Sequence, residues 1–336
     1  MRRCIRTLIA GAAAGLLVPV VALSAPAQAA PSVRVTGPGY DSPGSTVAVV
    51  VTTSSRPSGY ALSFRVSVGG VAGVCNGGQW KHGTAWSQRC WVTLPARTGT
   101  WSISGRAIFT RSGYATQYSA YGYKSIATKG YASAPVSAAT RDSIERCWNT
   151  SSRVQLTFDD GNVGWTNLNS MLATLKAYNV RGRFLPTGEW AAANPSKMAA
   201  IRNAGHLLGN HTYSHPALSS LSSSSVRWQI SHGVGATSSP KLIRPPYGAG
   251  AYSQRVTTDA AALGYRVCHW TTDTSDYAGV SATTIINKVL YGDAVTAPAR
   301  AGGVVLMHMS GANTPSALPG LIRGLRAKGL SLEPLR

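Results

Sequence analysis

The hydrophobic pattern of the chain changes near residue 135. Between residues 31 and 135, short runs rich in valine, threonine and aromatic residues are separated by Gly, Pro and Ser. Runs of this kind, bounded by turn-forming residues, are typical of β-strands. The predicted strands are residues 47–51, 60–68, 91–94 and 101–110. No useful stretch of helical period occurs in this region, so we predict a small, sandwich-like all-β accessory domain over residues 31–135.

A different pattern follows a Ser/Ala/Pro-containing linker at residues 131–137. Alanine-rich stretches with helical character alternate with apolar runs, and the predicted helices are residues 168–178, 195–204 and 253–263. The apolar runs at residues 154–158 and 303–308 predict buried strands. This alternation favours a parallel α/β architecture over residues 136–336.

The first 30 residues have the pattern of a secretory signal. Three arginines precede an apolar run at residues 8–23, and Ala27-Gln28-Ala29 resembles a cleavage site. We therefore expect a secreted protein, extracellular or associated with the cell wall, that has no stable membrane anchor.

Four cysteines remain beyond this segment: Cys75, Cys90, Cys147 and Cys268. An even number of cysteines in a secreted chain predicts two disulfides, and three pairings are open. We favour Cys75 with Cys90, which are near in sequence, and Cys147 with Cys268.

The strongest chemical signal is the pair Asp159-Asp160 at the end of a predicted strand, followed by Gly161. Side chains alternate along a strand, so adjacent carboxylates share one place only where the chain already turns. Two such carboxylates repel each other unless one of them binds a cation. The alternative interpretation is a pair of residues that caps a turn or a helix.

Two histidines, His211 and His215, lie four residues apart. A helical turn would place both on one face, as in other zinc sites. Two imidazoles and one carboxylate suit a divalent ion and leave positions open for water and substrate. Taken alone, the spacing is also compatible with chance.

Two further residues are candidates for the site, one before a pair of prolines and one at the end of a predicted strand. Arg244 precedes Pro245 and Pro246, which restrict the backbone, so its guanidinium can be aimed at a carboxylate. His308 ends the second predicted strand, a position suited to acid or base chemistry in an α/β barrel. The alternatives are an ordinary loop ion pair for Arg244 and a core histidine for His308.

Together these residues match a known pattern. From about residue 153 to 330 the chain resembles the polysaccharide deacetylases of carbohydrate esterase family 4, with a NodB-type catalytic domain. Five motifs follow in the order of that family: TFDDG at 157–161, HTYSH at 211–215, RPPY at 244–247, DTSDY at 273–277 and LMH at 306–308. The resemblance implies a distorted barrel of seven or eight β/α units.

The resemblance also implies roles for individual residues. Asp160, His211 and His215 resemble the metal ligands of the family. Asp159 resembles the general base that deprotonates the metal-bound water, and Arg244 the residue that orients this base.

The remaining motif residues correspond to the acid and to the pocket. The Tyr247 backbone amide is similar to the oxyanion donor of the family, and His308 to the general acid that protonates the leaving amine. Asp273 resembles the carboxylate that tunes this histidine. Leu306 and Tyr277 would line the pocket for the acetyl methyl group.

The implied function is a secreted hydrolase that removes N-acetyl groups from an N-acetylglucosamine-containing polysaccharide of peptidoglycan or chitin type and releases acetate. The implied cofactor is a divalent ion, zinc first, with cobalt and manganese as alternatives. Two other functions remain open, an acetyl xylan O-esterase with the same site and a non-catalytic cell-wall-binding protein on the same fold. We expect a monomer.

Charge adds a hypothesis about partners. The chain carries 32 Lys and Arg against 11 Asp and Glu, a net charge of +21, and residues 31–135 contain a single acid, Asp41. Such a field attracts polyanions. For a secreted chain, an anionic cell-wall polymer fits better than nucleic acid, which we do not expect as a partner. The alternative explanation is that the positive charge serves general solubility. The aromatic residues 118–123 are candidates for a glycan-binding surface.

Overall fold

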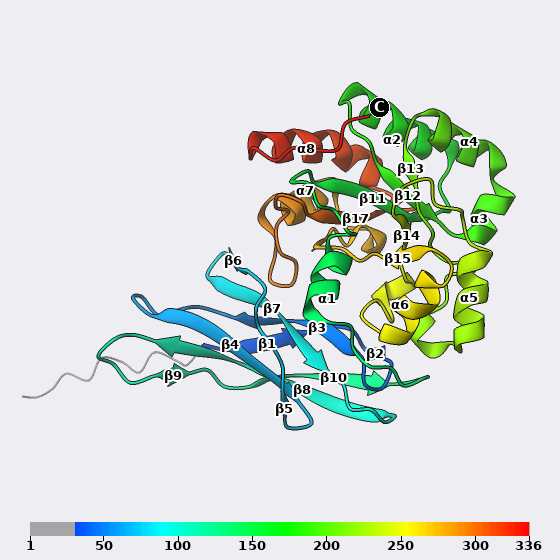
Figure 1. Ribbon diagram of the computed structural model, residues 1–336. Coiled ribbons are helices and arrows are strands. Elements are labelled where there is room, and N and C mark those ends of the chain that lie inside the picture. Colours follow the sequence, from blue (N-terminus) through cyan, green and yellow to red (C-terminus); the bar gives the residue numbers. More distant parts are fainter. Residues whose placement is uncertain (1–30, 336) are drawn as a thin grey trace, which may run out of the picture. The chain divides into compact units, whose positions relative to one another are not determined.

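Two β-sheets form the N-terminal part of the computed structural model, which describes residues 31–335 (Figure 1). The first sheet has the order β1 (Val33–Thr36), β3 (Thr46–Thr53), β7 (Ala85–Thr93) and β6 (Gln79–His82). The second has the order β2 (Tyr40–Asp41), β10 (Gly122–Thr128), β8 (Gly99–Thr110), β4 (Ala61–Val68) and β5 (Val71–Ala72), and β9 (Gln117–Tyr118) pairs with β8. The predicted signal segment, residues 1–30, lies outside the described residues.

The two sheets enclose a common core because their strands alternate inward and outward residues. Val47, Val49 and Val51 of β3 are buried and pack in one cluster with Phe64 of β4 and Ile103 of β8. All neighbouring strands are antiparallel except β2, which pairs in parallel with β10. The predicted all-β region and its four expected strands are therefore present.

Seven parallel strands follow within the described residues: β11 (Gln155–Asp160), β12 (Arg183–Pro186), β13 (Leu207–Leu208), β14 (Lys241–Ile243), β15 (Tyr265–Val267), β16 (Thr272–Asp273) and β17 (Val304–His308). Five of them pair in the order β13-β12-β11-β17-β16, and β14 pairs with β15. A parallel bridge between Asn210 and Ile243 joins the two groups. The strands thus follow chain order around a distorted barrel, and among the described residues no pairing closes the seam between β15 and β16.

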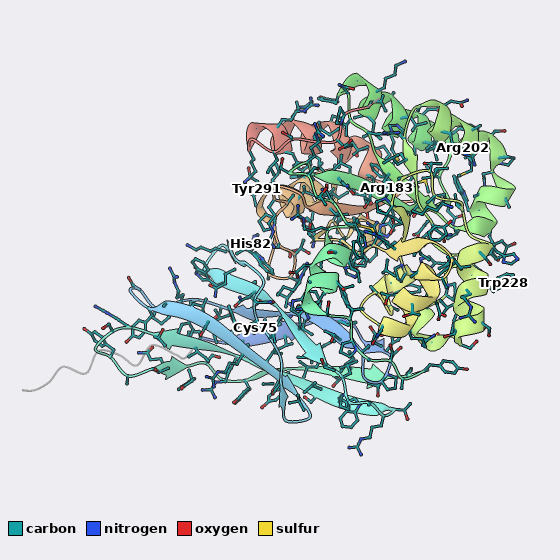
Figure 2. All side chains as sticks on the ribbon, viewed as in Figure 1. Cys75, His82, Arg183, Arg202, Trp228 and Tyr291 are labelled. Carbon is teal, nitrogen blue, oxygen red and sulfur yellow. A yellow bond between two sulfur atoms is a disulfide. The ribbon has the colours of Figure 1, made fainter. Side chains whose placement is uncertain are left out.

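Helices alternate with these strands: α1 (Ala138–Glu145), α2 (Trp165–Ala177), α3 (Gly188–Ala193), α4 (Pro195–Asn203), α5 (Ser223–Ser231), α6 (Gln254–Ala261), α7 (Ala282–Tyr291) and α8 (Thr314–Ala327). Single turns of 3₁₀ helix occur at η1 (Leu218–Ser220), η2 (Pro246–Gly248) and η3 (Asp276–Ala278). The exposed Arg202 and Trp228 lie on the outward sides of α4 and α5 (Figure 2). The three helices predicted from the sequence correspond to α2, α4 and α6.

Contacts from α1 and from the first sheet cover the seam between β15 and β16. The backbone N–H of His269, just after β15, donates to Ile144 O of α1 at 2.8 Å. Arg89 of β7 pairs with Glu145 of α1, and its Nη2 donates to Thr271 O at 3.1 Å. Buried polar groups need such partners, so these contacts stabilise an edge that lacks a neighbouring strand.

Two disulfides are present, Cys75–Cys90 and Cys147–Cys268, the pairing favoured from the sequence. The second joins the end of α1 to the end of β15, beside the seam. Residues 31–336 group as one compact unit, and a domain boundary near residue 135 stays a prediction. In the described part of the chain, no helix combines the length and apolar character that a bilayer crossing requires.

Candidate metal and acid–base site

The carboxyl ends of two neighbouring strands bring the first site residues together. β11 and β17 are parallel and paired, with Asp159 directly beside His308. Asp160 has a left-handed backbone (φ 72°), which turns the chain at the strand end. Gly161 follows with φ 149°, and a Cβ there would lie 2.4 Å from Trp190 Cγ, so only glycine fits. This turn brings both carboxylates to one histidine: Asp159 Oδ2 and Asp160 Oδ1 lie 3.9 and 3.2 Å from His211 Nε2.

Asp160, His211 and His215 form a compact set of ligand atoms that all lie within 4.8 Å of one another. The Asp160 Oδ1 lies 3.2 Å from Nε2 of each histidine, and this buried oxygen has no hydrogen-bond donor among the described residues. His211 Nδ1 lies 2.8 Å from Arg244 O, which can only accept, so Nδ1 carries the proton and Nε2 presents its lone pair. An orphaned carboxylate oxygen facing two imidazole nitrogens fits a divalent cation.

The two histidines lie on a loop between β13 and η1, which corrects the expectation of a helical turn. Thr212 and His215 have left-handed backbones, φ 67° and 62°. Asn210 Oδ1 accepts from Thr212 N at 2.8 Å, and Thr212 Oγ1 accepts from His215 N at 3.1 Å. These side-chain bonds replace helical ones and fold the loop so that both rings face Asp160.

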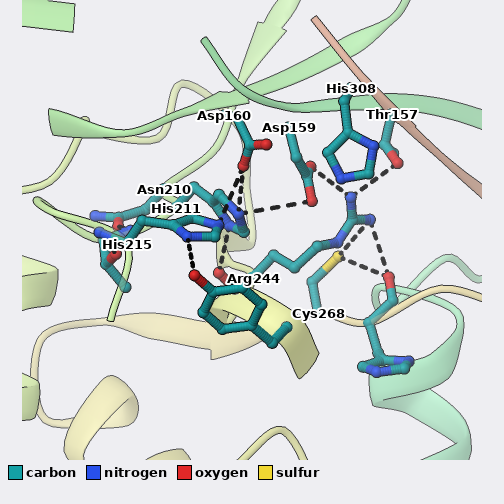
Figure 3. Close-up of polar contacts among 12 residues, drawn as sticks. Thr157, Asp159, Asp160, Asn210, His211, His215, Arg244, Cys268 and His308 are labelled. Carbon is teal, nitrogen blue, oxygen red and sulfur yellow. Dashed lines mark hydrogen bonds and ion pairs between the residues drawn. The ribbon is translucent and has the colours of Figure 1, made fainter. Parts of the chain in front are cut away.

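Asp159 is almost fully buried and is held by Arg244, a fully buried arginine (Figure 3). Arg244 Nη1 donates to Asp159 Oδ1 at 2.7 Å and to Thr157 Oγ1 at 2.9 Å. Its Nη2 donates to His269 O at 2.9 Å. Asp159 Oδ2 lies 3.9 Å from His211 Nε2. The guanidinium thus fixes one carboxylate oxygen and leaves the other directed toward the ligand set.

His308 pairs with Asp276, which corrects the expectation that Asp273 tunes this histidine. Asp276 Oδ1 lies 2.7 Å from His308 Nδ1, and its Oδ2 accepts from His308 N at 2.7 Å. Asp273 instead accepts from Ser275 N at 2.7 Å. The left-handed Ser275 (φ 54°) starts the η3 turn and brings Asp276 under β17. Asp273 and Asp276 both belong to the DTSDY motif, so the residue that pairs with His308 was already contained in that motif, as its second aspartate.

This pairing changes the protonation of His308. Burial by itself lowers the pKa of the imidazole, but the hydrogen bond to Asp276 and the charges of Asp276, Asp159 and Asp160 raise it to about 9. A proton therefore stays on the ring at neutral pH. Because Nδ1 is engaged by Asp276, Nε2 is the nitrogen that can give its proton to a reacting group.

The remaining predicted residues line a cleft of about 760 Å³. Leu306 is 4% exposed, whereas Tyr277 and Tyr247 are 64% and 66% exposed. The Tyr277 ring meets the His308 ring edge-on at 5.3 Å between centroids, and Tyr247 Oη lies 3.1 Å from His215 Nδ1. Tyr247 has a left-handed backbone (φ 60°). The sequence did not reveal that Tyr40 of β2 also lines this cleft, because nothing in the pattern links β2 to the barrel.

Comparisons with known proteins agree with these motifs. The sequence model described as polysaccharide deacetylase matches residues 149–268. A peptidoglycan-N-acetylglucosamine deacetylase of Bacillus cereus is 37% identical over 186 residues, 52% of this chain and 64% of that protein. A chitin deacetylase of Colletotrichum lindemuthianum is 34% identical over 192 residues, 52% of this chain and 75% of that protein. Among solved structures, a family 4 carbohydrate esterase from Streptomyces lividans has 31% identity and a TM-score of 0.46, covering 54% of this chain and 91% of that one.

The chain covers less than two thirds of the first curated relatives, 64% of the B. cereus protein and 37% of a Listeria monocytogenes peptidoglycan-N-acetylglucosamine deacetylase. The coverage of the fungal protein is larger, and the matched region contains both strand-end aspartates and both histidines of the ligand set. On these grounds the chain belongs to the polysaccharide deacetylase family.

Proposed function

We propose that this protein is a secreted, metal-dependent deacetylase that removes N-acetyl groups from an N-acetylglucosamine-containing polysaccharide. The observation that carries the proposal is the arrangement around Asp160 Oδ1. The ligand set around this oxygen fits a divalent ion. Beside it lie a candidate base, Asp159, held by Arg244, and a candidate acid, His308, held by Asp276. The names of the relatives, which are peptidoglycan and chitin deacetylases, support the choice of substrate class.

Asp160, His211 and His215 would hold the ion. A divalent ion supplies Lewis-acid polarisation of the acetyl carbonyl and lowers the pKa of a bound water to about 7. Two nitrogens and one carboxylate oxygen favour zinc, with cobalt and manganese as alternatives.

The residues of the chain supply the proton transfers. Asp159 accepts the proton of the attacking water on Oδ2, because Oδ1 is engaged by Arg244. The backbone N–H of Tyr247 donates to the oxyanion that develops on the acetyl carbonyl. His308 gives the proton on Nε2 to the nitrogen of the leaving sugar amine, which departs poorly unless it is protonated.

The acetyl methyl group needs a small apolar pocket beside the acid. Leu306 lies two residues before His308 on β17, and the exposed Tyr277 ring stands against the His308 ring. We assign the acetyl pocket to these two side chains. Two disulfides favour an oxidising compartment, in keeping with secretion to the extracellular space or the cell wall.

The decisive experiment is acetate release from a substrate panel with and without a chelator. The panel contains peptidoglycan strands, chitin oligomers and acetylated xylan of matched acetyl content. We expect release from the first two, loss of release after chelation and recovery with zinc. Release from xylan alone would identify an O-esterase, and no release from any substrate with zinc, cobalt or manganese supplied would overturn the proposed deacetylase activity.

A further inference from the structure

One face of the first β-sheet is turned toward the barrel. Cross-strand register aligns its outward residues in rows, with Thr36, Val50 and Arg89 in one row and Ala48 beside Trp91 in the next. The Trp91 ring meets Tyr252 of the barrel region edge-on at 5.0 Å. Side chains on one sheet face alternate with core residues, so this face is available to the barrel while Val49 and Val51 fill the sandwich core.

Polar contacts fix this arrangement at several points. Thr52 Oγ1 and Ser87 Oγ donate to Ala294 O at 2.6 and 2.8 Å, and Trp80 Nε1 donates to Asp293 O at 2.7 Å. Each contact joins a strand of the sheet to the loop after α7. The sheet is therefore held on the barrel through specific bonds to backbone carbonyls.

A second group of hydrogen bonds joins β2 to the segment that contains Tyr247. Asp41 of β2 is buried, and its carboxylate accepts from Ser42 N at 2.6 Å and from the backbone N–H of Gly250. Ser42 Oγ donates to Ser219 O at 3.1 Å. Gly250 lies three residues after Tyr247, so β2 supports the loop that presents one wall of the cleft.

The cleft that contains Asp159 and His308 consequently has a wall made by the β-region. Arg34, Thr36, Pro38 and Tyr40 line it opposite the barrel residues. Burial raises the pKa of the Tyr40 phenol, and the nearby charge of Tyr247 raises it further, as expected for two phenols that share one cleft.

Arg34 differs from the other charged groups of this cleft. It lies on the edge strand β1, its side chain is exposed, and it has no ion-pair partner among residues 31–335. The acids of the cleft are Asp41, Asp159 and Asp273, which lie inside hydrogen-bonded networks. An exposed, unpaired guanidinium that lines a cleft is suited to bind a carboxylate or phosphate.

We propose that the β-region supplies a glycan subsite of the catalytic cleft, in which Tyr40 stacks on a neighbouring sugar and Arg34 pairs with an acidic substituent of that chain. The inference rests on the proposed deacetylase function and narrows its substrate. The preferred ligand is a glycan that carries a carboxylate on a sugar next to the N-acetylglucosamine unit, rather than a neutral homopolymer. Tyr40 and Arg34 are specificity-determining residues of this subsite.

The test compares the full-length wild type with Arg34→Gln and Tyr40→Ala, and Arg65→Gln serves as the control. Arg65 is an exposed arginine on β4 that does not line the cleft. Each protein receives carboxylate-bearing glycan strands and chito-oligosaccharides of equal length, and kcat and KM for acetate release are measured at low and high salt.

For Arg34→Gln we expect KM to rise about 2- to 5-fold on the acidic strand at low salt, with KM on chito-oligosaccharide unchanged and the difference reduced by salt. For Tyr40→Ala we expect KM to rise about 3- to 10-fold on both substrates, with kcat retained. An equal effect of Arg65→Gln, or an Arg34→Gln effect that is the same on both substrates, would overturn the acidic subsite.

A binding measurement separates failure of the subsite from failure of the proposed function. If the wild type releases no acetate, calorimetric affinities of the same two strands for the wild type and Arg34→Gln still test the subsite. Weaker binding of the acidic strand alone by the variant supports it, and equal affinities refute it.

Discussion

Asp276 contacts His308 twice, through the imidazole Nδ1 and through the backbone N–H, each at 2.7 Å. The same carboxylate also accepts from Thr314 Oγ1 at 2.5 Å. These bonds fix the ring. Burial lowers the pKa of His308, but the side-chain hydrogen bond to Asp276 and the charges of Asp276, Asp159 and Asp160 outweigh burial and raise it to about 9. Asp276 therefore controls both the orientation and the protonation of the proposed acid.

The pH dependence of the rate follows from this pair. The raised pKa means that His308 is protonated below about 9 and loses its proton as pH rises through that value. The rate should therefore fall on the alkaline side. Asp276→Asn removes the charge that raises the pKa and should move this alkaline limb to lower pH, as measured by kcat for acetate release between pH 6 and 10.

Asp273→Asn is the matched comparison, since Asp273 lies three residues away in the same motif and has no hydrogen bond to the ring. Its alkaline limb should move less than that of Asp276→Asn. A larger shift for Asp273→Asn would return the tuning role to that residue.

Loss of the proposed acid should depend on the leaving group. His308→Ala should slow release of acetate from an N-acetylated oligosaccharide about 100- to 10,000-fold, because the amine needs a proton to leave. An activated aryl acetate has a good leaving group and should be affected much less. Equal losses on the two substrates would contradict the acid role.

The adjacent aspartates should separate into two phenotypes. Asp159→Asn should keep metal content and lose about 100- to 10,000-fold in kcat, because it removes the proposed base. Asp160→Ala should lose metal and turnover together. Metal analysis of the purified proteins, with acetate release measured in parallel, distinguishes the two; a metal-depleted Asp160→Ala that keeps full activity would exclude the site.

The second disulfide should matter for catalysis as well as for stability. Cys147 and Cys268 are 121 residues apart, and Arg244 Nη2 lies 3.7 and 3.5 Å from their sulfurs. Replacing both cysteines by serine should lower the free energy of unfolding by about 4–5 kcal/mol, from the entropy of the loop that the disulfide closes. It should also lower kcat, because Arg244 loses packing on the side opposite Asp159.

The Cys75–Cys90 disulfide spans 15 residues and lies away from Arg244, so it provides the control. Its double serine variant should cost about 3 kcal/mol and leave kcat unchanged at temperatures where the protein stays folded. Denaturant unfolding and kcat measured on both variants test the difference. Equal kcat in the two variants would show that Cys147–Cys268 contributes to stability and not to catalysis.

The buried ion pair of Arg89 and Glu145 should contribute stability that depends on pH. Burial raises the pKa of Glu145, but the charge of Arg89 and bonds with His269 and Tyr252 outweigh this and lower it to about 2, from an ordinary value of 4.5. The contribution is therefore present above pH 4.5 and lost as pH falls toward 2. Glu145→Gln should reduce unfolding free energy by about 3 kcal/mol at pH 7.

Urea unfolding of wild type and Glu145→Gln at pH 7 and pH 3 measures this effect. The difference between them should shrink at pH 3. Asp142→Asn, an exposed acid on the same helix, should differ little from wild type at either pH. A Glu145→Gln deficit that stays constant with pH would refute the linkage.

Much of the fold and of the site could be predicted from local sequence. The apolar runs ending at Asp159 and at His308 indicated two buried strands, and parallel pairing then placed their ends together. Arg244 was expected to orient Asp159, and the 2.7 Å contact agrees with this geometry. The two strand predictions are confirmed, and their ends meet because strand ends in an α/β barrel converge on one edge. The role of Arg244 stays a prediction.

Other features depend on tertiary structure that local patterns do not encode. A four-residue histidine spacing fits a helix as well as the loop with left-handed Thr212 that is found. The choice of Asp276 over Asp273 depends on a left-handed Ser275. Arg89 and Glu145 are 56 residues apart in sequence, one in the β-region and the other on α1. No hydrophobic periodicity predicts that they pair.

The seam between β15 and β16 has a consequence for how such chains can be recombined. The partners that cover it come from both sides of residue 135, Arg89 from one and Glu145 from the other. A gene fusion that kept the barrel and exchanged the β-region would leave the buried Glu145 carboxylate without its arginine partner. It would also expose Tyr252, against which Trp91 packs. The two halves should therefore be inherited as a pair, and an engineer who transplants the barrel must carry Arg89 with it or replace Glu145.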